Sequence, residues 1–211
     1  MAESLDIIAK LDSDVRFGPI HRILPSSGRK DIQQWQKSTQ DLLRILQRPR
    51  YVATGLLPEF QQLDGRHAFV KNHPLPPYEK SEWKGSSSSS SSSTSSNNGG
   101  GGGSGGDSSD APPPLGLDMS IKLKLYAEAM ASDPAPLIED LNARLVELDD
   151  MLYSDQHCSD CGGFSLDDID LWSRLRSVTI VKGVSWPAKL RRYMDNISAL
   201  GDVPLYDDMA L

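Results

Sequence analysis

The stretch HCSDCGGFSLDD, from His157 to Asp168, holds the residues whose types and spacing could do chemistry. Cys158 and Cys161 are separated by two residues, the spacing of dithiol motifs that exchange disulfides, and they are the only cysteines in the sequence. His157 stands next to them and could add a third ligand to a metal site. The first question is therefore whether this pair forms an active site.

A reactive dithiol places its first cysteine at the N-terminus of a helix, where the helix dipole stabilises the thiolate. Here Ser165 is the expected N-cap, so both cysteines precede the helix, and four nearby aspartates disfavour a thiolate. We expect Cys158 and Cys161 to lie in a surface loop outside any active site. An oxidisable regulatory pair and a metal site are the alternatives, although His157 and the cysteines supply only three of the four ligands that zinc needs. We assign no catalytic residue and no metal ligand.

The histidines offer no second site. His21, His67, His73 and His157 stand in or beside polar and proline-rich stretches, and none accompanies a recognisable nucleophile motif. We expect all four to be exposed loop residues.

Charge and hydropathy exclude several classes of protein. A net charge of −7 and a pI near 5.1 argue against binding to nucleic acid, which requires a basic face. No apolar run is long enough to cross a membrane. The N-terminus, MAESLDIIAKLDSD, is acidic and amphipathic, unlike a secretory signal. With only two cysteines, we expect a cytoplasmic protein.

Apolar residues at helical spacing predict helices in the first half of the chain at 3–11 and at 30 to about 47, where Pro49 ends or kinks the helix. A further helix is expected over 51–70, broken around Pro58. Residues 81–114 consist almost entirely of serine, glycine and other polar residues, which predicts a disordered insert.

After the insert, helices are expected over 117–131 and from Asp133 onward, the second with a continuous stripe of leucines: Leu137, Leu141, Leu145, Leu148 and Leu152. Ser165 and Asp168 form a capping box that opens the next helix, which we expect to end near Lys182 with Gly183 as its left-handed cap. This overrides the strand propensity of Val178 to Val181. A last helix begins at Trp186 and Pro187. The predicted fold is all-α.

The residues also resemble a known family. The segment GFSLDDIDLWSRLRSVTIVKGVSWPAKLRRYMDNI, residues 163–197, closely resembles the end of the glutaredoxin-2 family, whose fold is similar to that of glutathione transferases. The similarity extends to KDIQQWQK (30–37), RPRY (48–51) and ESLDIIAKLD (3–12). It implies a helical bundle of the glutathione-transferase C-terminal type.

Members of that family have an N-terminal thioredoxin-like half with a Cys-Pro-x-Cys dithiol, followed by a helical half. The resemblance places Glu3 and Ser4 at the pair that opens the last helix of the first half and binds the γ-glutamyl carboxylate of glutathione. The preceding strands and the dithiol have no counterpart in this sequence. The implied organisation is a helix remnant at 1–14, a linker at 15–29, a helical domain at 30–80 and 115–211, and the insert at 81–114.

The resemblance implies glutathione-dependent exchange with disulfide substrates, provided that an N-terminal dithiol half is present. We expect this chain alone to be inactive. The alternative is a non-catalytic helical binding module, whose uncovered apolar face would need a protein partner. Trp35 and Tyr51 could border the groove between the halves, although the core is the favoured place for both.

Overall fold

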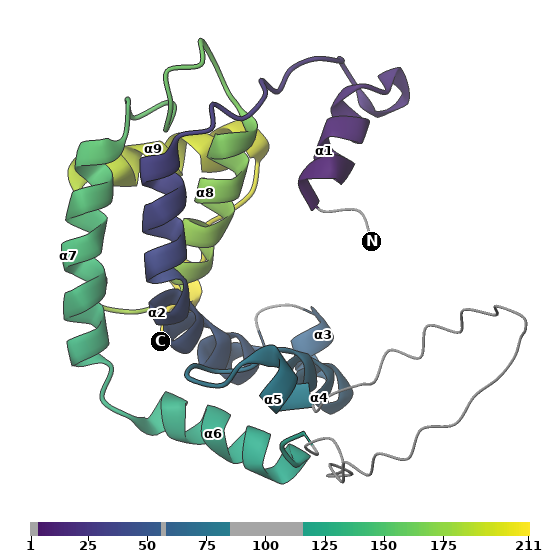
Figure 1. The fold of residues 1–211 in the computed structure, drawn as a ribbon, viewed down its shortest axis with the longest axis vertical. Helices are drawn as coiled ribbons and strands as arrows, with labels where there is room; N and C mark the ends of the chain where they lie inside the picture. Colours follow the sequence, from purple (N-terminus) through teal and green to yellow (C-terminus); the bar gives the residue numbers. More distant parts are fainter. Residues whose placement is uncertain (1–3, 56–57, 85–115) are drawn as a thin grey trace, which may run out of the picture.

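The computed structural model describes residues 4–55, 58–84 and 116–211. These residues form helices and no strand, apart from one isolated bridge between Leu24 and Ser165, so the predicted all-α class is confirmed (Figure 1). The α-helices are α1 (Ser4–Asp12), α2 (Lys30–Thr54), α3 (Pro58–Gln61), α4 (Leu63–Asn72), α5 (Lys80–Lys84), α6 (Met119–Ala131), α7 (Ala135–Met151), α8 (Leu166–Val178) and α9 (Ala188–Gly201). Two short 3-10 helices are η1 (Val15–Phe17) and η2 (Asp207–Met209).

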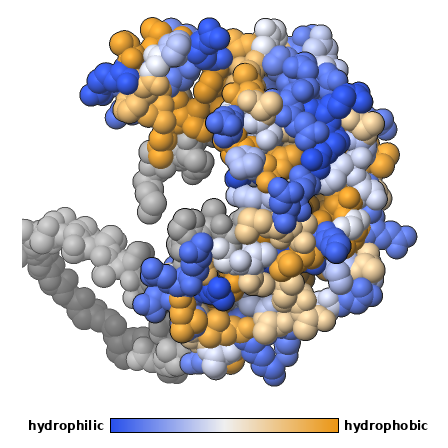
Figure 2. Space-filling model, turned by 180° about the vertical axis from the view of Figure 1, so that it is seen from behind, coloured by the Kyte–Doolittle hydropathy of each residue, from blue (hydrophilic) through white to orange (hydrophobic). Residues whose placement is uncertain are grey.

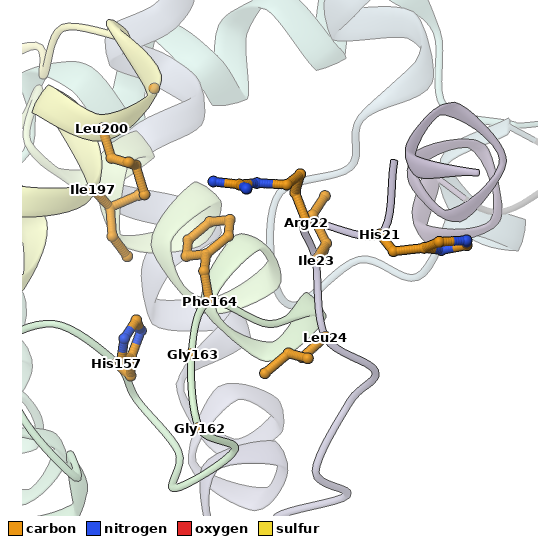
Figure 3. Close-up of a pocket in the computed structure, with 11 residues that line it drawn as sticks. His21, Arg22, Ile23, Leu24, His157, Gly162, Gly163, Phe164, Ile197 and Leu200 are labelled. Carbon is orange, nitrogen blue, oxygen red and sulfur yellow. The ribbon is translucent and has the colours of Figure 1, made fainter. Parts of the chain in front are cut away.

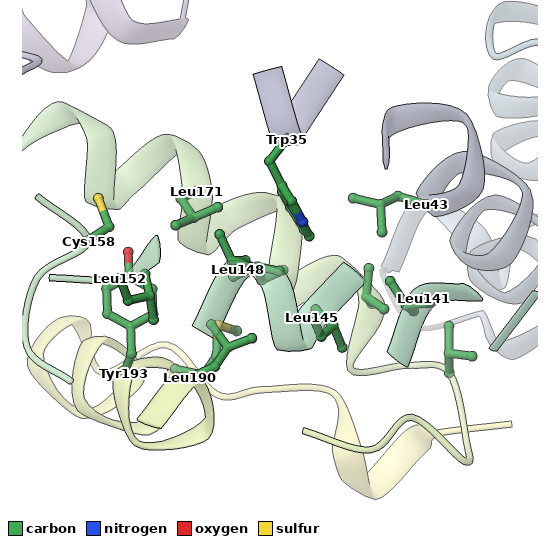
Figure 4. Close-up of a cluster of buried hydrophobic side chains, with 14 of the residues drawn as sticks. Trp35, Leu43, Leu141, Leu145, Leu148, Leu152, Cys158, Leu171, Leu190 and Tyr193 are labelled. Atoms are coloured by element: carbon green, nitrogen blue, oxygen red, sulfur yellow. The ribbon is translucent and has the colours of Figure 1, made fainter. Parts of the chain in front are cut away.

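The main core lies between α2, α7, α8 and α9 (Figure 4). The predicted leucine stripe of α7 fills its centre, and only Leu137 is half-buried rather than buried. Each fully buried leucine contributes about 1.5–3 kcal/mol of transfer free energy. Four residues of α9 meet this stripe from the other side: Leu190, Tyr193, Met194 and Ile197.

A second, smaller core joins α4, α5 and α6 to the end of α2. Trp83 of α5 is fully buried there, and its indole nitrogen donates to the carbonyl of Val70 at 2.7 Å. The hydroxyl of Tyr126 in α6 donates to the carbonyl of His73 at 2.7 Å. Residues 81–84, the first four of the predicted insert, therefore belong to α5. The rest of that insert, from residue 85 to 114, lies outside the described residues.

The prediction that the first bundle helix ends near residue 47 is wrong. Pro49 lies inside α2, which continues to Thr54 and ends where Gly55 adopts a left-handed φ of 60°. A proline in a helix removes one backbone hydrogen bond, but Pro49 and Arg50 are both buried, and this packing holds the last turn in place. Tyr51 therefore lies in the last turn of α2 rather than starting a second helix, and Pro58 is the first residue of α3.

The start of α8 follows the prediction and its end does not. Ser165 is the N-cap, and its amide donates to the carboxylate of Asp168 at 2.9 Å. The helix ends at Val178, well before Gly183, which is left-handed but caps no helix. The following residues leave the helix because Ile180 and Lys182 exchange backbone hydrogen bonds with Leu211, at 3.0 and 2.9 Å. The segment after Val178 is therefore a turn bonded to the C-terminal residue, neither the predicted helix nor a strand.

The helix α1 stands apart from the bundle and is joined to it by residues 13–29 (Figure 1). The carboxylate of Asp12 accepts the amide of Arg22 at 2.8 Å, which fixes the near end of this linker. At the far end the backbone of Leu24 bonds to Phe164 and Leu166, at 2.9 and 3.0 Å. The linker is therefore fastened both to α1 and to the residues that begin α8.

Candidate functional site: a cavity beside a buried aspartate

The two cysteines lie between α7 and α8, but the expectation of a surface loop is wrong for Cys158. Its side chain is fully buried in the main core, while Cys161 is half-buried, and both thiols are free. Burial, together with the negative charge of Asp168, raises the pKa of the Cys158 thiol to about 12. Such a thiol is protonated at neutral pH and is a poor nucleophile. Cys158 therefore lacks the reactive thiolate of a dithiol active site.

Asp168 is the organising residue of this region. Its carboxylate is fully buried and accepts the amide of Cys158 at 2.7 Å and both the amide and the hydroxyl of Ser165 at 2.9 Å. The hydroxyl of Tyr193, from α9, donates to the same carboxylate at 3.2 Å and points toward Cys158 (Figure 4). Asp168 thus joins the cysteine loop, the start of α8 and α9 by hydrogen bonds that satisfy its buried charge.

His157 lies at the edge of this cluster. Its Nδ1 atom is 3.9 Å from a carboxylate oxygen of Asp168 and is buried without a hydrogen-bond partner among the described residues. The side chain is 31% exposed, so His157 is not a fully exposed loop residue. The prediction also fails for His67, which lies in α4, and for His73, whose half-buried ring stacks on Phe69. Only His21 is exposed as expected.

A cavity of about 660 Å³ opens beside His157. Three segments that are distant in sequence surround it: linker residues 21–24, residues 162–164 before α8, and the end of α9. In Figure 3 the Phe164 ring stands in the middle of the cavity wall, opposite Ile197 and Leu200. The Arg22 side chain extends over the same space, while the His21 ring points away toward α1. The volume is in the range of small-molecule binding sites, about 300–1,000 Å³.

The structure describes the backbone of only one of the two residues predicted to bind glutathione. Ser4 is the first residue of α1, and Glu3 lies outside the described residues. Trp35 is buried in the main core, where its indole nitrogen donates to the carbonyl of Arg144 at 2.8 Å. Tyr51 is half-buried, and its ring centroid lies 6.1 Å from that of Tyr206. Both aromatic residues therefore have structural contacts in the bundle.

The helix α1 and the residues after it present apolar side chains to solvent. Ile7 is 51% exposed and Leu11 is 42% exposed, and Val15, Phe17 and Ile20 continue the same surface. We call these five residues the α1 apolar face. Figure 2 shows hydrophobic side chains on this arm of the molecule, which overhangs a hollow in the surface. An exposed apolar face on an amphipathic helix is typical of a surface that packs against another structure.

Among the described residues, no cluster of three or more histidine, cysteine, aspartate or glutamate side chains has the arrangement of a metal site. The searched part of the chain also holds no helix that is long and apolar enough to cross a membrane.

Comparison with solved structures shows which fold the chain has. The chain is similar over its whole length to the crystal structure of glutaredoxin 2 from Salmonella typhimurium in complex with glutathione, with a TM-score of 0.60 and 23% sequence identity. The aligned region is 72% of that protein. The predicted fold, an all-helical bundle of the glutathione-transferase C-terminal type, is confirmed.

Sequence comparison shows which proteins the C-terminal helices are similar to. Residues 120–210 match the family model described as "Glutaredoxin 2, C terminal domain". Over 75 residues the chain is 32% identical to glutaredoxin 2 of Escherichia coli K12, and equally to the proteins of strains O6:H1 and O157:H7. These alignments cover 36% of this chain and about a third, 34%, of the length of each relative. The predicted resemblance is thus confirmed for the C-terminal helices.

Proposed function

We propose that this chain forms the helical half of a glutathione-dependent disulfide oxidoreductase of the glutaredoxin 2 type. In this proposal residues 1–14 belong to the last helix of a thioredoxin-like half, 15–29 are the linker, and 30–80 with 115–211 form the helical domain around the 81–114 insert. The exchange chemistry requires the Cys-Pro-x-Cys dithiol of the thioredoxin-like half, because Cys158 is buried and protonated.

The observation that carries the proposal is the α1 apolar face. An isolated amphipathic helix gains no stability from apolar side chains that remain in water. Ile7 and Leu11 are about half exposed although the bundle has an extensive core of its own, so a further structure packing on α1 accounts for them. The Salmonella structure contains more than the region that this chain covers, which is 72% of it, and its complex with glutathione supports the choice of cofactor.

In the proposed reaction a thiolate of the dithiol attacks a substrate disulfide, one substrate sulfur leaves as a thiolate, and the second cysteine then displaces the other substrate sulfur, which leaves an intramolecular disulfide. Two molecules of glutathione reduce this disulfide back to the dithiol and become glutathione disulfide. Glu3 and Ser4 would hold the γ-glutamyl carboxylate of glutathione, through the serine hydroxyl and the amides at the start of α1. The helical bundle would form the opposite wall of the substrate groove.

The test compares this chain with a chimera in which the region of the Salmonella protein preceding its counterpart of α1 is joined to Glu3. Reduction of hydroxyethyl disulfide by glutathione is followed through the NADPH consumed by glutathione reductase. We expect no activity above the uncatalysed rate from the chain alone and glutathione-dependent activity from the chimera. Ile7→Asp should abolish the chimera's activity, whereas Ile121→Asp, at a residue of α6 that is 46% exposed, should not.

Activity of the chain alone would overturn the proposal, as would a chimera that is folded by circular dichroism, has two titratable thiols in its new half and still shows no turnover. The second outcome favours the alternative function, a non-catalytic module that uses the α1 apolar face to bind a protein partner.

A further inference from the structure

We propose that the cavity between the linker and α9 binds a small monocarboxylic acid with an alkyl chain. The Arg22 guanidinium would hold the carboxylate, and the apolar wall would hold the chain. This site is separate from the one proposed for glutathione, which involves Glu3, Ser4 and the thioredoxin-like half.

The wall of the cavity is apolar over most of its extent. Phe164 and Ile197 form its centre, Ile23 and Leu24 come from the linker, and Leu200 stands at the rim (Figure 3). Leu200 is 70% exposed, which leaves a large apolar side chain in water unless a ligand covers it. Such a wall favours a hydrocarbon chain over a polar ligand.

Gly162 and Gly163 line the cavity where the loop before α8 passes it. A methyl group placed on Gly162 would meet no heavy atom within 4 Å, so the space beside it is empty. At Gly163 it would lie 3.5 Å from a methyl carbon of Leu24, an ordinary contact. The loop before α8 therefore contributes backbone rather than side chains to this part of the wall.

The positive charge of Arg22 in the cavity favours a ligand with a negatively charged head group. Arg22 has no ion-pair partner within the described ranges, whereas Arg29 and Arg191 pair with aspartates at the surface. An unpaired guanidinium over an apolar space, in a chain of net charge −7, fits a carboxylate that accepts charge-assisted hydrogen bonds. Apart from Arg22, no lysine or arginine lines the cavity as the structure describes it.

The other end of the cavity disfavours a second negative charge. His157 lines it there, and the buried carboxylate of Asp168 lies 3.9 Å behind the histidine ring. A ligand with one anionic end and one apolar end therefore matches the cavity better than glutathione, which has charged groups at both ends and no alkyl chain.

The test uses ¹H–¹⁵N NMR of the full chain titrated with sodium octanoate and, separately, with octan-1-ol. We expect saturable octanoate shifts at residues 22–24, 162–164 and 197–201. Arg22→Ala should weaken octanoate binding by at least about tenfold and leave octanol binding unchanged, because only the acid uses the guanidinium. Lys37→Ala, which removes the same charge from an exposed position of α2, is the matched control and should change neither affinity.

Leu200→Asp should weaken both ligands, while Val146→Asp, at a residue of α7 that is 55% exposed, should weaken neither. All four substituted residues are exposed, so the variants are expected to fold. Three results would overturn the proposal: no saturable shifts, shifts confined to the α1 apolar face, or equal octanoate affinity in the wild type and Arg22→Ala. None of these readouts involves disulfide exchange, so they do not depend on the function proposed above.

Discussion

The hydrogen bonds of Asp168 allow a prediction about stability. The substitution Asp168→Ala removes a fully buried carboxylate that accepts four hydrogen bonds. Two of the donors are the backbone amides of Cys158 and Ser165, which cannot turn toward another acceptor. We expect this substitution to be among the most destabilising single changes in the bundle.

The magnitude follows from the donors that are left without a partner. Each buried amide without an acceptor costs about 1–3 kcal/mol. The hydroxyls of Ser165 and Tyr193 can rotate, so each loses only the net value of a hydrogen bond, about 0.5–1.5 kcal/mol. Together these contributions predict a loss of about 3–9 kcal/mol in the free energy of unfolding. For a chain of this length such a loss lowers Tm by between about 6 and 36 °C.

Urea unfolding followed by circular dichroism at 222 nm measures the loss, and two further variants calibrate it. Asp168→Asn retains one acceptor oxygen and should lose about half as much as Asp168→Ala. Asp170→Ala removes a partly exposed carboxylate two residues along the same helix, which pairs with Arg174 at 3.1 Å, and should cost less than about 1 kcal/mol. If Asp168→Ala loses no more stability than Asp170→Ala, the reasoning from buried hydrogen bonds is refuted.

Three more outcomes are expected. In native protein at pH 8, iodoacetamide should modify Cys161 and leave Cys158 unmodified by mass spectrometry, because burial raises the pKa of Cys158 to about 12; equal rates would contradict this. Leu145→Ala should cost about 2–5 kcal/mol in urea unfolding, and Val146→Ala less than about 0.5 kcal/mol, because only Leu145 is buried. Burial lowers the pKa of His73 below its value in the unfolded chain, near 6.5, so the stability that the neutral histidine contributes is present above pH 6.5 and is lost as the pH falls. His73→Gln should therefore reduce the fall in Tm between pH 7 and pH 5, measured by thermal unfolding. An unchanged dependence of Tm on pH would exclude His73 as its cause.

Helix positions were predictable from the sequence where the signals are local. The leucines of α7 repeat at helical spacing, and their burial follows from that periodicity. Ser165 and Asp168 are three residues apart, so the start of α8 could be located from residue types alone.

The prediction failed where distant contacts decide the structure. Pro49 is compatible with α2 because the bundle packs around it, and the end of α8 depends on backbone bonds between Ile180 and Leu211. Cys158 is buried because Asp168 binds its amide, although the surrounding sequence is polar. Neither spacing nor composition contains this information.

The cavity was not predictable for the same reason. Its residues come from the linker, the loop before α8 and the end of α9, and no two of these segments adjoin in the sequence. Arg22 stands between His21 and Ile23 without a recognisable motif, and Leu200 follows the helical pattern of α9 only loosely. The one local signal was the pair of glycines before Phe164, which indicates an open backbone but no ligand.

The linker between α1 and the bundle is anchored by a carboxylate at each end. Asp12 accepts the amide of Arg22 at 2.8 Å, and Asp167, at the start of α8, accepts the amide of Ser27 at 2.8 Å. A segment held at both ends acts as a rigid spacer rather than a flexible tether. Any structure that packs on α1 would therefore sit at one fixed angle to the bundle.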